Sequence, residues 1–484
     1  MSTERTSDPI DLLVVGGGTA GLPTAIEAAE NGLSVLLVEK SGHLGGTLWR
    51  SWAQMAAAGT ELQSRHGIHD DPDLHYDDVM RISRGTANPE LVRLAVDHGA
   101  ETIDWLMSRG FDMDPDAPAI LYFHEPYSVA RTYWGRNAGR SVLDVLLPEV
   151  QRHIDQGRIR VRTGTDLVGL RGGEGPSVDA AVLRSAAGAV EEVEAHAVVL
   201  ATGGYAGNPR LFPLLTDGAP LRGPAAPTSA GDGIIAALAL GARLRGRDMF
   251  LPTYGGTLKP DSDWVTSHLD DYPLLTPQSR LPWEIHVNRS GRRFVAEDDE
   301  SVDKRENALT RQSGLEFWIV YDQGAAEEAS PLFPAWEKED LEKAFSEHPS
   351  FARADDLDEL AALTGVDPQG LRTTVEEYNA AVATGTDPWG RTHLPAPIDR
   401  APFYAVRNHG TALKSPAGLA VDGRLRVLGG DDRPFTNLYA VGEALGGSSM
   451  SGRSFVSGMS VTPALSFGRL IGRAVAGADH HRRT

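Results

Sequence analysis

The sequence DLLVVGGGTAGLPTAIEAAENGLSVLLVE, residues 11–39, carries the strongest structural signal in the chain. Residues 11–15 form an apolar run that is too short for a helix and runs into glycines, which predicts a buried parallel strand. An alanine-rich helical stretch follows at about residues 22–31, with Pro23 tolerated in its first turn. Residues 34–38 repeat the short apolar run. The stretch therefore predicts one βαβ unit.

The glycines between the first strand and the helix have the spacing of a dinucleotide-binding turn. Gly16 permits the tight turn, Gly18 lets the backbone approach a pyrophosphate, and Gly21 allows close packing of helix on strand. The helix N-terminus then faces the phosphates. Glu39 ends the second strand, 23 residues after the first glycine, where it can accept hydrogen bonds from ribose hydroxyls. A carboxylate there favours an unphosphorylated ribose, as in FAD or NAD.

Small or hydrogen-bonding residues recur at several other strand ends and loops, and they favour the longer cofactor, FAD. They follow the second strand, occur again near residue 58, and end the predicted strands 197–200 and 438–441. The helix that begins near residue 460 would direct its positive end at the flavin pyrimidine. The predicted cofactor-binding residues are Gly16, Gly18, Thr19, Ala20, Gly21, Glu39, Lys40, Gly45, Gly46, Thr47, Ala58, Gly59, Thr60, Ala201, Thr202, Gly203, Asp232, Gly442, Glu443, Ser460 and Val461.

The remaining pattern predicts an α/β fold of two domains. Helices are expected at 77–85, 89–109 and 141–156, and a small antiparallel meander within 158–196. Residues from about 250 to 404 are richer in Pro, Trp and acidic side chains and lack another βαβ signature. We therefore expect a Rossmann-like FAD-binding domain of residues 1–249 and 405–484, with an inserted α+β capping or substrate domain at 250–404.

Composition excludes several classes of function. The 484 residues include 46 Lys+Arg and 66 Asp+Glu, a net charge of −20, which argues against broad binding to nucleic acid or anionic lipid. There is no cysteine, so an iron–sulfur cluster, a thiolate metal site and a cysteinyl flavin tether are excluded. The spacing of the histidines suggests no metal site. No segment has the length of a membrane span, and a cytoplasmic protein is expected.

Five motifs together resemble one known superfamily. Besides the N-terminal fingerprint, the segments 43–47 (HLGGT), 201–208 (ATGGYAGN), 287–294 (VNRSGRRF) and 439–443 (YAVGE) are similar to those of the FAD-dependent fumarate reductase/succinate dehydrogenase flavoproteins. That superfamily includes 3-ketosteroid dehydrogenases and urocanate reductases. The resemblance covers nearly the whole chain in the right order, and it implies FAD, an inserted cap and redox chemistry at a carbon–carbon bond beside a carbonyl.

Within the superfamily, the motifs resemble the ketosteroid dehydrogenase branch more than the dicarboxylate reducers. The reducers' His-Pro-Thr is Leu251-Pro252-Thr253 here, and the segment 409–418 (HGTALKSPAG) is closer to the dehydrogenases' Gly-Thr-Lys-Gly-Gly. Phe455 lies where the reducers carry Arg-Leu-Gly-Gly, with Arg453 slightly displaced. The segment 462–468 also resembles the dehydrogenase C-terminus. Such a pocket is less suited to clamping two carboxylates.

The chemistry implied by this resemblance needs an acid/base at the α carbon and donors for the carbonyl oxygen. The predicted catalytic or substrate-contacting residues are Arg453, Tyr133, Tyr254 and His409, each of which also has a purely structural interpretation. The first expectation is dehydrogenation of a cyclic ketone or steroid-like substrate by hydride transfer to flavin N5. Reduction of an unsaturated acid, as in fumarate reductase, and a flavin-binding protein without catalysis are the alternatives. Because only one dinucleotide fingerprint is present, an external electron acceptor or donor is expected as partner.

Overall fold

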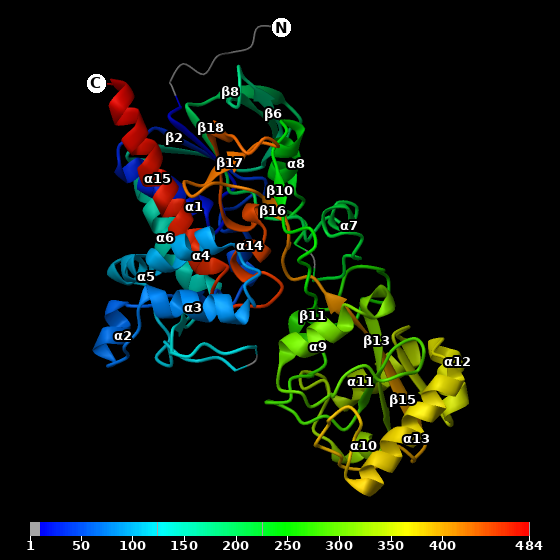
Figure 1. Cartoon of the computed structure of the whole chain (residues 1–484). Helices are drawn as coiled ribbons and strands as arrows, with labels where there is room; N and C mark the ends of the chain where they lie inside the picture. The colour runs from blue at the N-terminus through cyan, green and yellow to red at the C-terminus, as the bar shows by residue number, and fades with distance from the viewer. Residues whose placement is uncertain (1–9, 123, 225, 484) are drawn as a thin grey trace.

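The computed structural model describes residues 10–122, 124–224 and 226–483, which form two bodies (Figure 1). The larger body is built on a six-stranded sheet in the order β17-β18-β9-β1-β2-β5. Strand β1 pairs in parallel with β2 on one side and with β9 on the other. These strands span Leu12–Val15 (β1), Val35–Val38 (β2), Ile159–Arg162 (β5), Ala197–Leu200 (β9), Arg426–Leu428 (β17) and Pro434–Ala440 (β18). The predicted βαβ unit is thus at the centre of the sheet.

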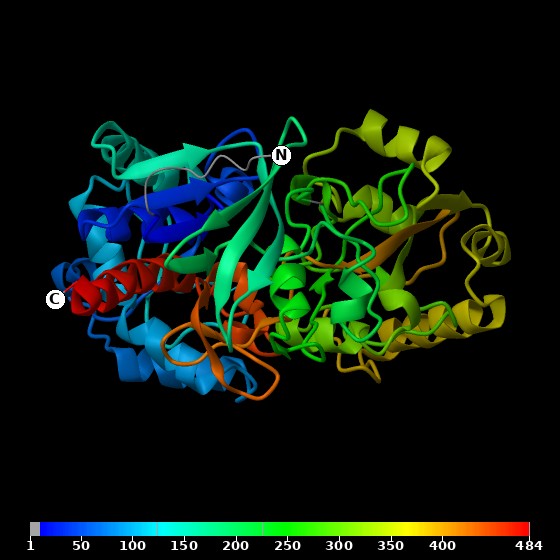
Figure 2. The ribbon, with the colours of Figure 1, turned by 90° about the horizontal axis from the view of Figure 1, so that it is seen from above.

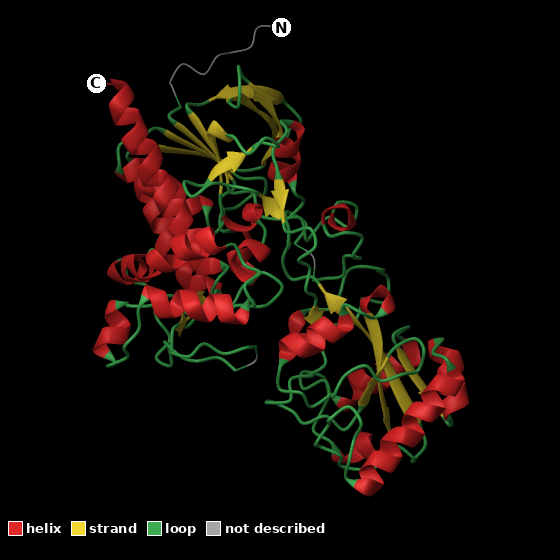
Figure 3. Cartoon of the chain, viewed as in Figure 1, coloured by secondary structure: helices red, strands yellow, loops and turns green. Residues whose placement is uncertain are grey.

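Helices cover one face of this sheet, as the secondary-structure colouring shows (Figure 3). The first helix, α1, packs on β1 and β2 and along the C-terminal helix α15. The helices of this body are α1 (Gly21–Glu30), α2 (Glu61–Arg65), α3 (Pro72–Ile82), α4 (Pro89–Asp97), α5 (Gly99–Ser108), α6 (Gly139–Asp155), α7 (Phe212–Leu215), α8 (Asp232–Ala239), α14 (Ser448–Ser451) and α15 (Val461–Arg483). The single helix predicted at 89–109 is two helices that meet at His98–Gly99.

The antiparallel meander covers the other side of the sheet and is shorter than predicted. It consists of β6 (Thr165–Gly172), β7 (Val178–Ser185) and β8 (Val190–Glu194). Residues 159–162, which alternation placed in the meander, instead form the parallel edge strand β5 beside β2. An edge strand is buried on one face only, so it shows the same alternation as a meander strand. Short two-stranded pairs join β3 (Met55–Ala56) to β4 (Thr132–Tyr133) and β10 (Leu244–Arg245) to β16 (Gly418–Leu419).

The second body lies beside the first in two perpendicular views (Figures 1 and 2). Its antiparallel sheet has the order β11-β15-β13-β12, with β14 also paired to β15. The strands are β11 (Thr253–Tyr254), β12 (Ile285–Val287), β13 (Glu316–Asp322), β14 (Phe351–Ala354) and β15 (Phe403–Thr411). The helices are α9 (Val302–Leu309), α10 (Gln323–Glu328), α11 (Lys338–Glu347), α12 (Leu357–Thr364) and α13 (Pro368–Thr384). The predicted domain boundary after residue 404 falls inside β15.

In the described part of the chain, three short 3₁₀ turns contribute to the lining of the cavity described below, and a fourth, η3, precedes β13. They are η1 (Gly46–Arg50), η2 (Leu269–Asp271), η3 (Ser313–Leu315) and η4 (Gly442–Leu445). Among the described residues, no helix combines the length and the hydropathy needed to cross a bilayer.

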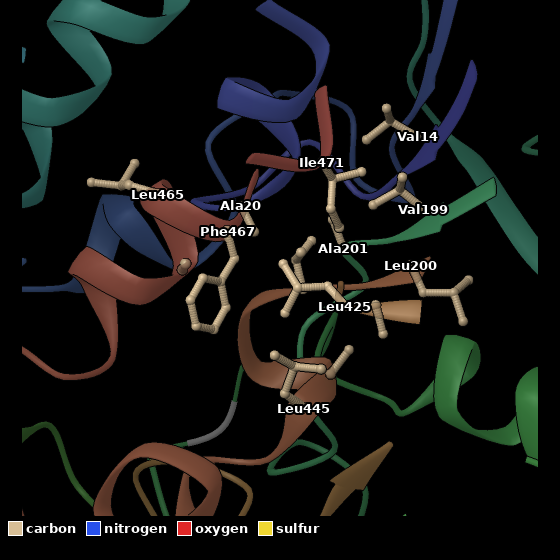
Figure 4. Close-up of a cluster of buried hydrophobic side chains, with 14 of the residues drawn as sticks. Val14, Ala20, Val199, Leu200, Ala201, Leu425, Leu445, Leu465, Phe467 and Ile471 are labelled. Atoms are coloured by element: carbon tan, nitrogen blue, oxygen red, sulfur yellow. The ribbon is translucent and has the colours of Figure 1, made fainter. Parts of the chain in front are cut away.

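The two bodies have separate hydrophobic cores. The fully buried members of the largest apolar cluster come from residues 10–242 and 412–475, whereas two smaller clusters come entirely from residues 254–406. In the large core, side chains of β1 and β9 meet those of α15, among them Leu465 and Ile471 (Figure 4). The strands are buried along their whole length because helices and the meander cover both faces of the sheet.

Candidate active site

A cavity of about 510 Å³ opens at the carboxyl ends of strands β1, β2, β9 and β18. In parallel sheets this edge is where dinucleotides bind, because the loops that leave the strands converge there. The cavity is lined by the glycine turn after β1, by η1, by the loop after β9, by η4 and by the start of α15. Most of the predicted cofactor-binding segments thus meet at one place.

The glycine turn has the backbone geometry that a dinucleotide needs. Gly16 has φ +104°, which disfavours other residues, and a Cβ on Gly21 would collide with the carbonyl oxygen of Gly16. A Cβ on Gly18 would instead have only the Cα of Gly46 nearby, at 3.7 Å, and Gly18 lines the cavity. The first and third glycines therefore fix the turn, while the second leaves room for the pyrophosphate.

Glu39 is held at the end of β2 by the backbone around it. Its Oε2 accepts a hydrogen bond from the Gly17 amide at 2.8 Å, and its Oε1 accepts from the amide and hydroxyl of Ser41 at 2.8 and 2.9 Å. Each carboxylate oxygen keeps further acceptor capacity toward the cavity, where Glu39 is part of the lining. Next to it, Lys40 pairs with Asp232 at 2.6 Å, which joins β2 to the N-terminus of α8.

The far end of the cavity offers polar groups for a long cofactor. The hydroxyl of Thr202 lines the cavity and has no hydrogen-bond partner among the described residues, although its oxygen is buried. Glu443 accepts a hydrogen bond from the Ser415 amide at 2.7 Å. Helix α15 begins at Val461, and its first residues also line the cavity, so its positive end faces the site. The Thr202 hydroxyl, the Glu443 carboxylate and the N-terminus of α15 together suit a dinucleotide with an extended second half.

The structure brings most of the predicted cofactor-binding residues into the lining and leaves five outside it. The lining contains Gly16, Gly18, Thr19, Ala20, Glu39, Lys40, Gly46, Thr47, Ala201, Thr202, Gly203, Asp232, Gly442, Glu443, Ser460 and Val461. Gly21, Gly45, Ala58, Gly59 and Thr60 do not contribute to it. Thr60 instead caps helix α2, where its hydroxyl accepts from the Gln63 amide at 3.1 Å.

Tyr133, predicted in a loop, lies in the two-residue strand β4 and is fully buried. Its hydroxyl forms a 2.8 Å hydrogen bond with the Thr60 hydroxyl, and burial raises its pKa. It is outside the cavity lining. Arg453, the other candidate from this body, has a side chain 53% exposed and pairs with Asp248 at 2.7 Å. Its guanidinium therefore lies at the surface and not beside the predicted flavin edge.

The other two candidates, Tyr254 and His409, belong to the second sheet. The hydroxyl of Tyr254 contacts Nδ1 of His286 at 2.9 Å, and its ring stacks on Phe317. His409 is fully buried in β15, and burial, followed by the charges of Arg222 and Arg407, lowers its pKa to about 2. Neither residue is among the cavity lining, and His409 is neutral.

Sequence patterns did not single out Lys414, a charged residue of the cavity lining. Lys414 lines the cavity, and its Nζ lies 5.3 Å from the centre of the Phe455 ring, which is also part of the lining. On the same aromatic ring, His124 stacks with a centroid distance of 4.1 Å. Lys414 belongs to the segment 409–418 (HGTALKSPAG), and the family resemblance of that segment is the signal that could have identified it.

Two carboxyl groups of helix α9 lie beside His124. Asp303 and Glu306 are buried, and their ligand atoms and that of His124 lie within 4.8 Å of one another. His124 precedes these residues by about 180 positions, so no sequence spacing could reveal the cluster. The grouping could admit a cation, although the charges of Lys414 and Arg305 act on it.

Together, the parallel sheet, the glycine turn and the cavity define a dinucleotide-binding protein with a second sheet inserted between strands of the first. Similarity to known protein families identifies which dinucleotide-binding family this is. Residues 11–461 match the family described as FAD binding domain, and the chain belongs to that family. It is an FAD-dependent oxidoreductase, and FAD is its cofactor.

Relatives of known name share this architecture over nearly the whole chain. A probable fumarate reductase of Shewanella frigidimarina (strain NCIMB 400) is 28% identical over 96% of this chain and 74% of the relative. A 4-oxocyclohexanecarboxylate 2-dehydrogenase of Sinomonas cyclohexanicum is 27% identical over 96% and 93%, respectively. The crystal structure of a 3-ketosteroid Δ1-dehydrogenase from Sterolibacterium denitrificans superposes with a TM-score of 0.76. It is 21% identical, and the match covers 98% of this chain and 100% of that chain. The predicted resemblance to fumarate reductases and 3-ketosteroid dehydrogenases is confirmed.

Proposed function

We propose that this enzyme dehydrogenates a cyclic ketone at the bond between the α and β carbons. The observation that supports it is the lining supplied by residues 412–460, in which Lys414 is the one cationic side chain. The apolar residues of that stretch are Leu413, Leu445, Met450, Phe455, Val456 and Met459. A largely apolar pocket with one lysine suits a ring that carries a single carbonyl.

A dicarboxylate is a poorer match for these residues. Clamping two carboxylates calls for at least two cations, preferably arginines with their forked donors. Arg453 is paired with Asp248 at the surface, and Leu251 replaces a histidine at the start of the second sheet. One carboxylate on a ring ketone would still find Lys414, and the Sinomonas relative is named for a keto acid of that kind.

The chain's own residues would bind, orient and desolvate the substrate. Bound FAD supplies the two-electron acceptor for a hydride from the β carbon. Phe455 and Leu413 would exclude water, and Lys414 would address the carbonyl side of the ring. We further propose that residues 1–249 and 405–484 form the FAD-binding domain and that residues 250–404 cap the substrate. An external acceptor then reoxidises the flavin.

Reduction of an unsaturated acid is the second candidate function. It is favoured by the ammonium of Lys414, which can pair with one carboxylate, and by the identity to the Shewanella relative. The two candidates differ in the direction of electron flow and in the substrate's charge.

An anaerobic experiment with the purified flavoprotein tests both candidates. The oxidised enzyme is mixed with cyclohexanone, 4-oxocyclohexanecarboxylate and a saturated 3-ketosteroid, and the flavin absorbance near 450 nm is followed. Bleaching by a ketone supports the dehydrogenase. The photoreduced enzyme is mixed in parallel with fumarate and acrylate; rapid reoxidation by these acids without bleaching by any ketone would replace the first proposal by the second.

A further inference from the structure

Lys414 has the placement of a group that exchanges protons with a substrate. Its side chain lines the cavity, and its Nζ lies 3.4 Å from the hydroxyl of Ser451. The aliphatic stem passes over Gly447, where a Cβ would come within 2.8 Å of Cδ of Lys414. Only a glycine leaves room for the stem in this position. The ammonium is thus held at one place near Phe455.

Near Phe455, a carboxyl group is buried with few polar neighbours. Asp303 is 0% exposed, and the hydroxyl of Ser454 and the backbone amide of Phe455 face its carboxylate. Its Oδ1 lies 3.9 Å from Nδ1 of His124. Glu306, one turn further along α9, completes the group. Burying an ionised carboxylate in this way costs several kcal/mol, so a proton or a cation must neutralise it.

The electrostatics favour a shared proton over a cation. Burial, and then the charge of Asp303, raises the pKa of Glu306 well above its ordinary value, against the opposing charges of Arg305 and Lys414. Burial also raises the pKa of Asp303. Two carboxyl groups this close do not ionise independently, and one proton between them is the low-energy state.

Lys414 and His124 are both shifted toward their neutral forms. Burial lowers the pKa of Lys414, against the charges of Glu443, Glu306 and Asp303. Burial, followed by the charges of Lys414 and Arg305, lowers the pKa of His124 to about 3. The groups that face Asp303 besides these are Glu125 and Arg84, and the hydroxyl of Ser454. A lysine whose pKa is lowered by burial and which lines the cavity has the properties of a general base.

We propose that Lys414 is the catalytic base that takes the proton from the substrate's α carbon, and that Asp303 and Glu306 are positioning residues whose charge acts on Lys414. The inference rests on the proposed function. In the dehydrogenation, the C–H bond at the β carbon breaks and its electron pair leaves with the hydride. The C–H bond at the α carbon breaks, its electron pair forms the C=C bond, and its proton becomes the third N–H bond of Lys414. The ammonium then returns this proton to solvent.

The first test measures the charge of Lys414 in the holoprotein without turnover. The chain has six lysines, at positions 40, 259, 304, 338, 343 and 414, so reductive ¹³C-methylation and NMR resolve them, with K414R assigning the signal. We expect Lys414 to titrate at a lower pH than the other five. D303N and E306Q remove negative charge that favours the ammonium, so each lowers this pKa further.

A matched control lies on the same helix. Lys304 is 67% exposed in its side chain and pairs only weakly with Asp299, at 3.4 Å. K304M removes a positive charge from α9 and should leave the Lys414 titration where it is. If Lys414 titrates together with Lys304, or if D303N and E306Q do not move it, the inference is wrong.

The second test follows the α proton itself. Exchange of the ketone's α hydrogen into D₂O is measured by mass spectrometry in the holoenzyme, together with substrate binding from the flavin difference spectrum. K414M and K414R should each lose about 100-fold or more in exchange. K414R keeps the positive charge, so restored exchange in K414R would show that Lys414 is only an electrostatic anchor.

Two further outcomes are informative. One distinguishes failure of the proposed ketone dehydrogenation from failure of the assignment of Lys414, and the other reveals a metal ion at the carboxyl pair. In one outcome, no ketone bleaches the wild-type flavin, although Lys414 still titrates at a lower pH than the other lysines and responds to D303N. The proposed function is then wrong, and so is the assignment of Lys414 as the base in ketone dehydrogenation. A stoichiometric divalent cation in elemental analysis of wild type, lost in D303N, would overturn the role of Asp303 and Glu306 as positioning residues, because the carboxyl pair would then bind a metal.

Discussion

At the scale of single residues, Glu39 is the side chain whose role is most directly testable. It accepts hydrogen bonds from the Gly17 amide and from Ser41, and it lines the cavity. Hydrogen bonds to an ionised acceptor contribute about 1.5–3 kcal/mol each. E39Q replaces one carboxylate oxygen by a donor, which opposes both the Gly17 amide and a ribose hydroxyl. We expect FAD to bind about 10- to 100-fold more weakly, measured by flavin fluorescence quenching in the apoprotein. Glu191, an exposed residue of β8, provides the control E191Q, and equal affinity in the two variants would contradict this role.

Two glycines of the same turn should respond to alanine in opposite ways. At Gly21 a Cβ collides with the backbone carbonyl of Gly16, so G21A should prevent folding or leave little soluble protein. At Gly18 the nearest atom lies at 3.7 Å, so G18A should keep the far-ultraviolet circular dichroism of wild type and lose FAD affinity. A G18A protein that binds FAD as wild type does would show that the pyrophosphate is not held there.

The residue scale also shows where sequence reasoning reaches its limit. The glycine turn and Glu39 could be predicted because each is adjacent in sequence to the strand that positions it. Lys414 carried a family pattern and was still not selected, since nothing in the sequence shows which side chain of a loop points inward. The cluster of His124 with Asp303 and Glu306 is formed by two segments about 180 residues apart, and only the packing of α9 against the loop that carries His124 brings them together.

At the scale of elements, the contact of α1 with α15 depends on a buried ion network. Glu27 of α1 pairs with Arg469 at 2.6 Å and with Arg473 at 2.9 Å, and the first pair is almost fully buried. Removing one partner of a buried pair costs about 3–5 kcal/mol, because the other charge stays buried. We expect E27Q to lower the free energy of unfolding by about 3 kcal/mol in urea denaturation. E30Q, at the end of the same helix, removes more exposed pairs and should cost about 1 kcal/mol or less.

The same network makes the effect of E27Q depend on pH. Burial alone would raise the pKa of Glu27, but its arginine partners outweigh burial and lower it below the ordinary 4.5. A carboxyl whose pKa falls on folding stabilises the folded state above its unfolded pKa and loses that contribution as pH drops through its folded pKa. The stability difference between wild type and E27Q should therefore be constant near neutral pH and shrink below about pH 4.5. A difference that persists at pH 3 would contradict the ion-pair explanation.

Element prediction succeeded where one signal was strong and failed where two structures give the same pattern. The βαβ unit was predicted because it has two apolar runs and a helix with clear ends. The break between α4 and α5 was not predicted, because His98–Gly99 interrupts the helix without disturbing its apolar periodicity. Apolar and polar residues alternate in β5 as they do in the meander strands. The parallel pairing of β5 with β2 depends on tertiary structure, which this alternation does not reveal.

At the scale of the whole molecule, separate cores predict separate unfolding. The buried members of the apolar clusters do not mix residues of 254–406 with those of the sheet that forms the FAD cavity, and the partly buried Trp264 is the one described apolar residue of 254–406 that packs against the first core. The links between the two bodies include polar contacts such as the hydrogen bond of Ser301 to Glu125 at 2.5 Å and that of the Arg222 guanidinium to the Gly314 carbonyl. Such contacts are weak compared with a shared core, so each body should unfold as its own cooperative unit.

FAD distinguishes the two units, because the lining of its cavity comes from the first body apart from His268 and Leu269. A ligand present at 100 times its Kd stabilises the unit that binds it by about 2.7 kcal/mol. Calorimetry of the apoprotein should show two transitions, and excess FAD should move one of them upward while the other stays. G18A should abolish that shift without altering the second transition, since Gly18 lies outside the second core. If instead both transitions move together, the cap is coupled to the FAD-binding domain more tightly than its cores indicate, and the division at residues 250–404 is wrong.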